Sequence, residues 1–273
     1  MLTASLFYLS KSTQNLPLDN YLCQWLLLKR IMNIFLMQYF TNGGGLVRAN
    51  SIKEIRRSEL SRAAFKAVIL YGLRKTTLEK VGNIAGVSKG VVLHHFKDKS
   101  ALLEAVFRSS NTLLSGSVVE LYRYAVTPYE RLWAIIVANF FETIFNRQVC
   151  QAWVSLISEV PHNSECQRVQ IANNERIRTN LMHELKHFLP EQEAEQVARH
   201  LGVHIDGIWV RAGLLPHPVE TNVAISEVQF AIEKLLPFDE ISAAKHKEAR
   251  KKIEAIADIA LGSKAFKEKF LQV

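Results

Sequence analysis

This chain of 273 residues has little cysteine and no uninterrupted hydrophobic run long enough to span a membrane. Its three cysteines, Cys23, Cys150 and Cys166, are too few and too scattered for a disulfide framework or a zinc ribbon. They are typical of a protein in a reducing cytoplasm. Charged side chains interrupt the apolar stretch from Leu22 to Phe40, and it lacks a small-residue cleavage site. We therefore expect no membrane span, no membrane partner and no secretory signal.

Strand signals are also missing from the sequence. No segment alternates polar and apolar residues between turn signals, whereas helical spacing of apolar residues recurs along the chain. We find no glycine-rich phosphate loop and no nucleophile elbow. A content of 48% hydrophobic and 22% charged residues is ordinary for a soluble protein with a sizeable core. The sequence predicts an all-α fold without a cofactor.

The most informative stretch has the pattern of a helix-turn-helix. Thr76 and Thr77 can cap a short helix, and Ser88 can cap a second helix after a turn of small residues. In the second helix Val92 and Phe96 are four residues apart, so both face inward. Val91, His94 and His95 are then expected on the outer face. A recognition helix presents this face to a DNA major groove.

Positive charge is concentrated on the same part of the chain. Residues 51–108 hold twelve Lys/Arg against five Asp/Glu, whereas residues 109–238 hold ten against fourteen. This distribution is the footprint expected of a phosphate-binding surface. Arg56 and Arg57 precede the first expected helix, either as an arm along the DNA or as a solvated face. The predicted DNA contacts are Arg56, Arg57, Thr77, Ser88, Lys89, Gly90, Val91, His94, His95 and Lys99.

Roles can be assigned to these residues from their chemistry. Ser88, Thr77 and Lys99 are expected on phosphates, and Gly90 leaves room for a phosphate to come close. Lys89, Val91 and His94 are expected on base edges, where Val91 can meet a thymine methyl group.

The turn and the segment after it resemble the TetR family of bacterial repressors. The matching residues are Gly86-Val87-Ser88-Lys89-Gly90 and the exit Phe96-Lys97-Asp98-Lys99-Ser100-Ala101-Leu102-Leu103, within a resemblance that runs from about Arg56 to Phe107. Leu93 stands where the family usually has Tyr, and Gly82 where it usually has Ala. The resemblance implies an N-terminal three-helix DNA-binding domain, a helical ligand-binding and dimerisation domain, and a double-stranded DNA operator as partner.

The middle of the chain resembles the choline-responsive BetI subgroup of that family. The resemblance rests on Asn139-Phe140-Phe141-Glu142-Thr143, Ala152-Trp153 and Ile205-Asp206-Gly207-Ile208-Trp209-Val210-Arg211-Ala212. In that subgroup choline releases a repressor from genes that convert choline to glycine betaine. A quaternary ammonium group needs aromatic faces and a nearby carboxylate. Candidate ligand residues are therefore Trp133, Phe140, Glu142 and Trp153, although aromatic residues at helical spacing are more often core.

The resemblance also implies a homodimer. Two recognition helices about 34–36 Å apart can read successive major-groove faces of a pseudo-palindrome. The last two helices of the middle segment carry small residues that allow close helix approach. The candidate interface residues are Gly202, Asp206, Trp209 and Arg211.

These patterns divide the chain into four parts. We expect an extension over residues 1–50, either disordered or upstream of a natural start near Val47, a DNA-binding domain over 51–108, a body over 109–238 and a Lys-rich helical tail over 239–273, solvated or partly disordered. The expected helices run from Leu60 to Tyr71, from Thr77 to Ala85, from Ser88, from Asp98 towards Tyr124, and then over Pro128–Phe145, Cys150–Val160, Ser164–Leu189, Glu191–Leu215 and Thr221–Leu236.

One further motif points to a different class of protein. His183-Glu184-Leu185-Lys186-His187 matches the H-E-x-x-H signature of zinc metalloproteases, and His200 with His204 forms another pair one turn apart. The third ligand of the longer signature is absent, and such histidine pairs are common on polar helix faces. We expect no enzyme and no metal. The alternatives are a metal-dependent hydrolase, and a TetR-type activator or repressor of unrelated genes that senses another small ligand.

Overall fold

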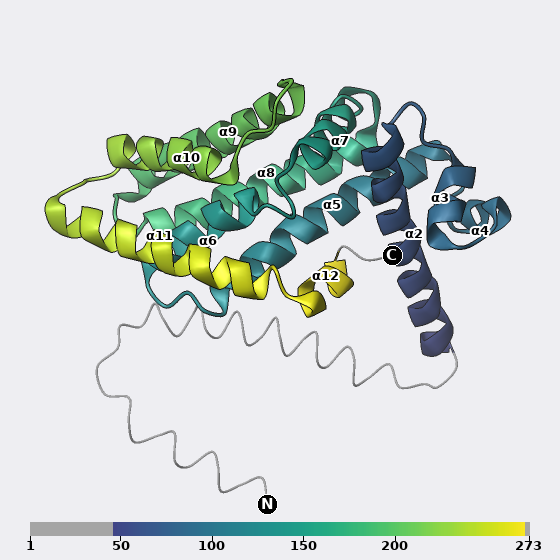
Figure 1. The fold of residues 1–273 in the computed structure, drawn as a ribbon, viewed down its shortest axis with the longest axis horizontal. Coiled ribbons are helices and arrows are strands. Elements are labelled where there is room, and N and C mark those ends of the chain that lie inside the picture. Colours follow the sequence, from purple (N-terminus) through teal and green to yellow (C-terminus); the bar gives the residue numbers. More distant parts are fainter. Residues whose placement is uncertain (1–45, 271–273) are drawn as a thin grey trace, which may run out of the picture. The chain divides into compact units, whose positions relative to one another are not determined.

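The computed structural model describes residues 46–270, and these residues contain helices but no strand (Figure 1), which confirms the all-α prediction. The expectations for residues 1–45, which include most of the predicted extension, lie outside the described residues. From Arg56 onward the chain forms one unit, and the contacts reported below are within it. No helix among the described residues is both long and apolar enough to cross a bilayer.

The helices follow the predicted order with some shifted ends. They are α2 (Leu46–Tyr71), α3 (Leu78–Ala85), α4 (Lys89–His95), α5 (Lys99–Tyr122), α6 (Pro128–Phe140), α7 (Arg147–Ile157), a 3₁₀ turn (Val160–His162), α8 (Ser164–Leu185), α9 (Glu191–Leu214), α10 (Thr221–Leu235), α11 (Glu240–Ala260) and α12 (Lys264–Phe270).

The two largest shifts of a predicted helix boundary have local reasons. The helix from Pro128 ends at Phe140 instead of Phe145, because Phe141 adopts an extended backbone and Asn146 caps the next helix by accepting from the Val149 backbone N–H. Ile144 and Phe145 of the intervening loop are buried, so they continued the helical pattern in the sequence without belonging to the helix. The first helix begins at Leu46 and not near Leu60, which places Arg56 and Arg57 inside a helix rather than on an arm.

Helices α2, α3 and α4 form the helix-turn-helix head through the predicted caps. The Thr77 hydroxyl accepts from the Lys80 backbone N–H and the Ser88 hydroxyl accepts from the Val91 backbone N–H. Gly86 ends α3 in the left-handed region, at a φ of 68° that favours glycine. Val92 and Phe96 are fully buried, as the spacing predicted.

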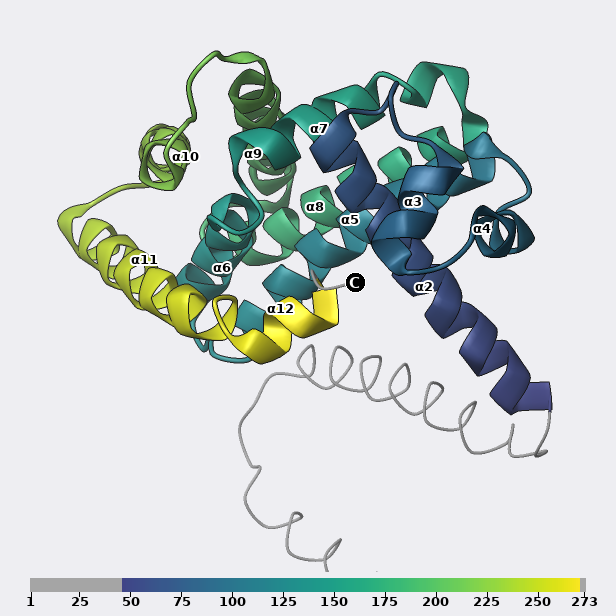
Figure 2. The same ribbon diagram turned by 45° about the vertical axis from the view of Figure 1, so that its right-hand side comes forward.

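Helix α6 lies at the centre of the body. Every residue from Leu132 to Phe140 is buried, because α5, α8, α10 and α11 pack around this helix (Figures 1 and 2). Helices α7 and α8 both pack against α9. A Cβ on Gly213 of α9 would lie 2.7 Å from the Cys150 carbonyl oxygen of α7, so glycine is what lets these two helices approach so closely.

The C-terminal helix α11 corrects the prediction of a solvated or partly disordered tail. Asp239 and Ser242 form a capping box at its start, and the helix then packs along α6 (Figures 1 and 2). Its inner face is buried and consists of His246, Ala249, Ile253 and Ala257. Lys252 also pairs with Glu130 of α6 at 2.9 Å. The lysine side chains of α11 remain exposed while its apolar face is buried, so α11 belongs to the core of the body.

Candidate nucleic-acid interface and body pockets

The outer face of α4 presents most of the predicted base-reading side chains. Lys89, Gly90, Val91 and His94 are exposed, while Val92 on the opposite face is fully buried. Leu93, at the position where a Tyr was expected, is exposed beside them. His95 differs, because it is only half-exposed. The head therefore offers a short basic helix with an apolar contact point, which suits insertion into a major groove.

The predicted phosphate contacts lie around this helix. Thr77 and Ser88 are exposed, and each hydroxyl retains an O–H that can donate to a phosphate while its oxygen caps the helix. Lys99 is the first residue of α5, directly after Asp98, whose carboxylate accepts from the Ala101 backbone N–H at 2.8 Å.

The two α2 arginines that were predicted to contact DNA have partners within the head. Arg57 donates to the His95 carbonyl oxygen at 3.0 Å, and its guanidinium lies 4.8 Å from the centre of the Phe96 ring. Arg56 pairs with Glu59 at 2.8 Å. Arg57 thus holds the end of α4 against α2, a role that its place in the sequence did not indicate.

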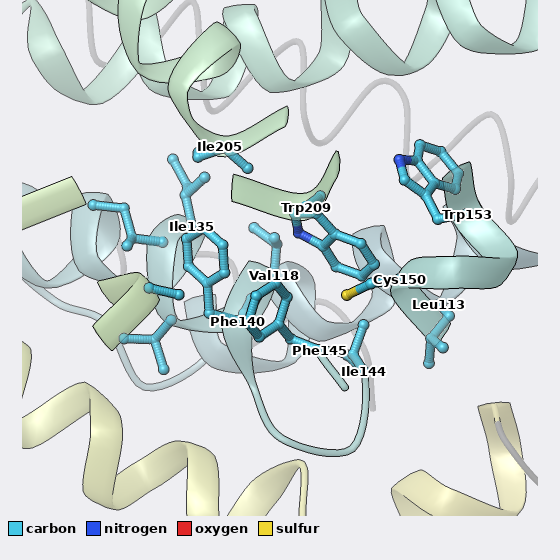
Figure 3. Close-up of a cluster of buried hydrophobic side chains, with 14 of the residues drawn as sticks. Leu113, Val118, Ile135, Phe140, Ile144, Phe145, Cys150, Trp153, Ile205 and Trp209 are labelled. Carbon is cyan, nitrogen blue, oxygen red and sulfur yellow. The ribbon is translucent and has the colours of Figure 1, made fainter. Parts of the chain in front are cut away.

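The structure does not bring the four predicted ligand residues together. Trp133 is buried and its indole N–H donates to Nδ1 of His246 at 3.2 Å. Phe140 packs edge-to-face on Phe145 (Figure 3). Trp153 packs between Phe107 and Trp209, at 5.4 Å and 6.2 Å between ring centres. Glu142 is exposed. These three aromatic residues are core, the alternative that the sequence left open.

Glu142 instead lines a pocket of about 640 Å³ between α6, the start of α10 and α11. Its carboxylates are Glu142, Glu220, Glu254 and Asp258, its one basic residue is Arg147, and its apolar lining is Val137, Phe141, Phe145, Pro218, Val219, Ile225 and Ala257. Excess negative charge beside two phenyl rings suits a small cation. The sequence reasoning missed Glu254 and Asp258, because both lie in the segment that was assigned to a solvated tail.

The predicted interface residues of α9 fall on different faces of that helix. Trp209 is buried inside the chain against Phe145 and Trp153 (Figure 3), so it is not an outward-facing interface residue. Arg211 is exposed and Gly202 is half-exposed. Burial raises the pKa of Asp206 to about 6. The outward surface of α9 and α10 carries large apolar side chains, namely Val203, Leu214, Val223 and Phe230, each at least half exposed.

The glutamate of the H-E-x-x-H motif, Glu184, forms an ion pair with Arg131. Helix α8 ends at Leu185, so His187 lies beyond it. Glu184 is fully buried and accepts from Arg131 Nε at 2.8 Å and from the Tyr122 hydroxyl at 3.4 Å. Burial, together with the charge of Glu184, raises the pKa of Tyr122. Ligand atoms of His183, Glu184 and His187 lie within 4.8 Å of one another, but the carboxylate is already used to join α8 to α5 and α6. His200 and His204 lie on α9, where they line a groove against α10.

Comparison with known proteins gives the fold a family. Residues 60–106 match the model for bacterial regulatory proteins of the tetR family, and residues 128–237 match the C-terminal domain of BetI-type transcriptional repressors. The chain is 34% identical to the HTH-type transcriptional regulator BetI of Burkholderia ambifaria over 189 residues, which are 69% of this chain and 97% of the relative.

Solved structures share the fold at lower identity. A transcriptional regulator from Rhodococcus sp. Rha1 superposes with a TM-score of 0.59 at 22% identity, covering 66% of this chain and 95% of that one. A transcriptional regulator from Saccharomonospora viridis, solved in complex with choline, gives 0.57 at 17% identity, covering 68% of this chain and 99% of that one. With a matching head, body and full-length relatives, the chain belongs to the TetR family of DNA-binding transcriptional regulators, in the group with a BetI-type repressor C-terminal domain.

Proposed function

We propose that this repressor is a cytoplasmic homodimer that a small quaternary amine, with choline as the first candidate, releases from its operator. The observation that carries the choice of effector is the acidic pocket between α6, α10 and α11. The names of the BetI relatives and the choline complex of the Saccharomonospora viridis regulator support the same choice. The repressed genes would then be those that convert choline to glycine betaine.

The chemistry of the pocket favours a cation over an anion. Four carboxylates face one arginine there, and Glu254 is itself paired with Arg250 at 2.8 Å, which leaves a net negative lining. Phe141, which is only half-buried, offers ring surface that a methylated ammonium can cover. A desolvated cation–π contact contributes about 2 kcal/mol. A carboxylate nearby adds attraction without needing a hydrogen-bond donor on the ligand.

Helix α5 offers a route from the body to the head. Near its start, Leu102, Leu103 and Val106 border a small cavity together with Ala64 and Val68 of α2. Further along it packs against α6, whose C-terminal end borders the acidic pocket. A ligand that moves α6 would therefore shift α5 and the spacing of two recognition helices. Coupling of this kind is typically about 1–3 kcal/mol and acts equally in both directions.

The homodimer is supported by the outward surface of α9 and α10. Val203 is 74% exposed and Phe230 is 62% exposed, although both are large apolar side chains. Apolar surface of this kind, gathered on two neighbouring helices, is typical of an interface between subunits. We propose no catalytic role for Glu184, because its carboxylate is held by Arg131 and Tyr122.

Fluorescence anisotropy with labelled DNA from the region upstream of its own gene tests this function. Choline or betaine aldehyde should weaken DNA binding, and Glu142→Gln or Glu254→Gln should reduce that response by about tenfold, as loss of one pocket charge implies. Glu248→Gln, on the exposed face of α11, is the matched control and should respond like the wild type. If only unrelated drugs release the DNA, the repressor senses another ligand.

A further inference from the structure

A second cavity, of about 580 Å³, lies between α5 and α8 and has the opposite chemistry. Its lining consists of Arg108, Asn111, Thr112, Arg168, Val169, Ala172, Asn173 and Arg176. Three of these residues are arginines and none is acidic. This cavity shares no residue with the acidic pocket, and its chemistry is not explained by binding of a cation.

Arg176 is the deepest of the three arginines. One guanidinium nitrogen donates to the backbone carbonyl oxygen of Asn111 at 3.5 Å, and another donates to the side-chain oxygen of Asn173. Within residues 46–270, no carboxylate lies within ion-pair distance of it. Burial lowers the pKa of the guanidinium, yet an arginine remains charged at neutral pH. A half-buried cation is thus held by neutral oxygens alone.

Asn111 gives an independent indication of a ligand site. The residue is only 5% exposed and lines the cavity from α5. Neither the nitrogen nor the oxygen of its side-chain amide has a hydrogen-bond partner in the described part of the chain. Buried polar groups are nearly always hydrogen-bonded, so an unsatisfied amide in a cavity calls for a partner. Its N–H₂ group can donate to a ligand oxygen, as the guanidinium of Arg176 can.

Arg108 and Arg168 complete the cavity at its rim. Arg108 pairs with Glu104 at 2.7 Å, and Arg168 pairs with Glu165. Both side chains are exposed, so their ion pairs are weak and can exchange partners. The two rim pairs cancel in charge, which leaves the charge of Arg176 uncompensated inside the cavity.

We propose that this cavity is a binding site for a small molecule that carries an oxyanion, either a phosphate or a carboxylate. Arg176 would pair with two ligand oxygens, since the planar guanidinium fork fits both groups, and the Asn111 amide would donate to one of them. Arg108 and Arg168 would close over the ligand from the rim. The site is independent of the proposed release by a quaternary amine, and its occupant would link α5 to α8.

Isothermal titration calorimetry with inorganic phosphate and with succinate, at constant ionic strength, tests the site in the full chain. We expect at least one of the two anions to bind, and Arg176→Met to weaken that binding about tenfold or more, as expected when a charge-assisted pair is lost. Arg123→Met is the matched control, because Arg123 is an exposed arginine at the other end of α5. It should bind the anion like the wild type.

A second variant separates a ligand site from a structural role. Asn111→Leu should weaken anion binding severalfold while leaving the ligand-free protein at least as stable as the wild type, because the amide has no partner to lose. Thermal unfolding without the anion measures this. The proposal is overturned if neither anion binds, or if Arg176→Met or Asn111→Leu binds the anion as tightly as the wild type.

Discussion

His246 lies on the buried face of α11, the helix whose Lys-rich composition predicted a solvated or partly disordered tail. Its ring lies among Tyr129, Trp133, Phe188 and Phe238, with ring centres 4.8 to 6.3 Å away. Since Trp133 donates to Nδ1, the imidazole is neutral and its remaining N–H is on Nε2. Burial lowers the pKa of His246 to about 4. A protonated ring would place two donors against each other.

This burial makes stability depend on pH. The pKa of His246 is about 4 in the folded state and 6.5 ordinarily, so the unfolded chain takes up the proton first. The contribution of the neutral His246 to the free energy of unfolding is therefore complete above pH 6.5. It decreases as the pH falls towards 4, by about 2 kcal/mol at pH 5. Urea unfolding at pH 7 and pH 5 measures the loss.

His246→Gln should lose about 2 kcal/mol less than the wild type over the same pH interval, because the titrating ring is gone. His162→Gln, an exposed position in the 3₁₀ turn, serves as the control. Asp206 acts in the opposite sense, because its raised pKa favours the folded state at low pH, and it does so equally in all three proteins. An unchanged pH dependence in His246→Gln would refute the assignment.

Two glycines of the head are predicted to respond differently to alanine. A Cβ on Gly82 would lie 2.6 Å from the Val87 carbonyl oxygen, whereas a Cβ on Gly90 would meet only the Ser88 hydroxyl oxygen at 3.6 Å. Gly82→Ala should destabilise the head although alanine favours helices by about 1 kcal/mol. Gly90→Ala should keep or raise the melting temperature and weaken DNA binding, because Gly90 is expected beside a phosphate. Equal melting temperatures would contradict the close approach at Gly82.

At the scale of the element, α4 and the start of α5 are predicted to divide the work of DNA binding. Val91→Ala should change sequence preference at one base pair, since the exposed Val91 can meet a thymine methyl group. Lys99→Ala should weaken binding to all sequences and reduce the salt slope by about one unit. Competition binding at several salt concentrations distinguishes them. Equal losses of specificity from both would contradict these roles.

Substitutions at two isoleucines of α11 test whether this helix packs on α6 in solution. Ile253 is fully buried, whereas Ile259 on the same helix is 77% exposed. Ile253→Ala should cost about 2–5 kcal/mol of unfolding free energy, while Ile259→Ala should stay within about 0.5 kcal/mol of the wild type. Chemical denaturation measures both. If both variants lose little unfolding free energy, α11 does not pack on α6 in solution.

The elements that could be predicted from sequence are those with local signals. Thr77, Ser88 and Asp98 each cap the following helix through their own side chains, so the head follows from short stretches of sequence. The acidic pocket could not be predicted, because Glu142 and Glu254 are brought together only when α11 packs on α6. In the Lys-rich sequence of α11, few residues indicate its buried face, which consists of His246, Ala249, Ile253 and Ala257.

At the scale of the whole molecule, the outward surface of α9 and α10 should govern assembly. Phe230→Arg should convert the proposed dimer to a monomer, because a charge would be buried in an apolar interface. Ile241→Arg, on the exposed face of α11, is the matched control and should remain dimeric. Light scattering after gel filtration measures the mass. A dimer that persists in Phe230→Arg would place the interface elsewhere.

Helix α5 sets a limit on how this repressor can be divided or recombined. The predicted boundary at residue 108 falls within α5, between Leu102, which faces the head, and Leu113, which lies in the buried cluster of the body (Figure 3). A chain cut there would expose apolar surface on both fragments. Chimeras that exchange DNA specificity between relatives should therefore be joined in the loop after Tyr122, with the whole helix inherited from one parent.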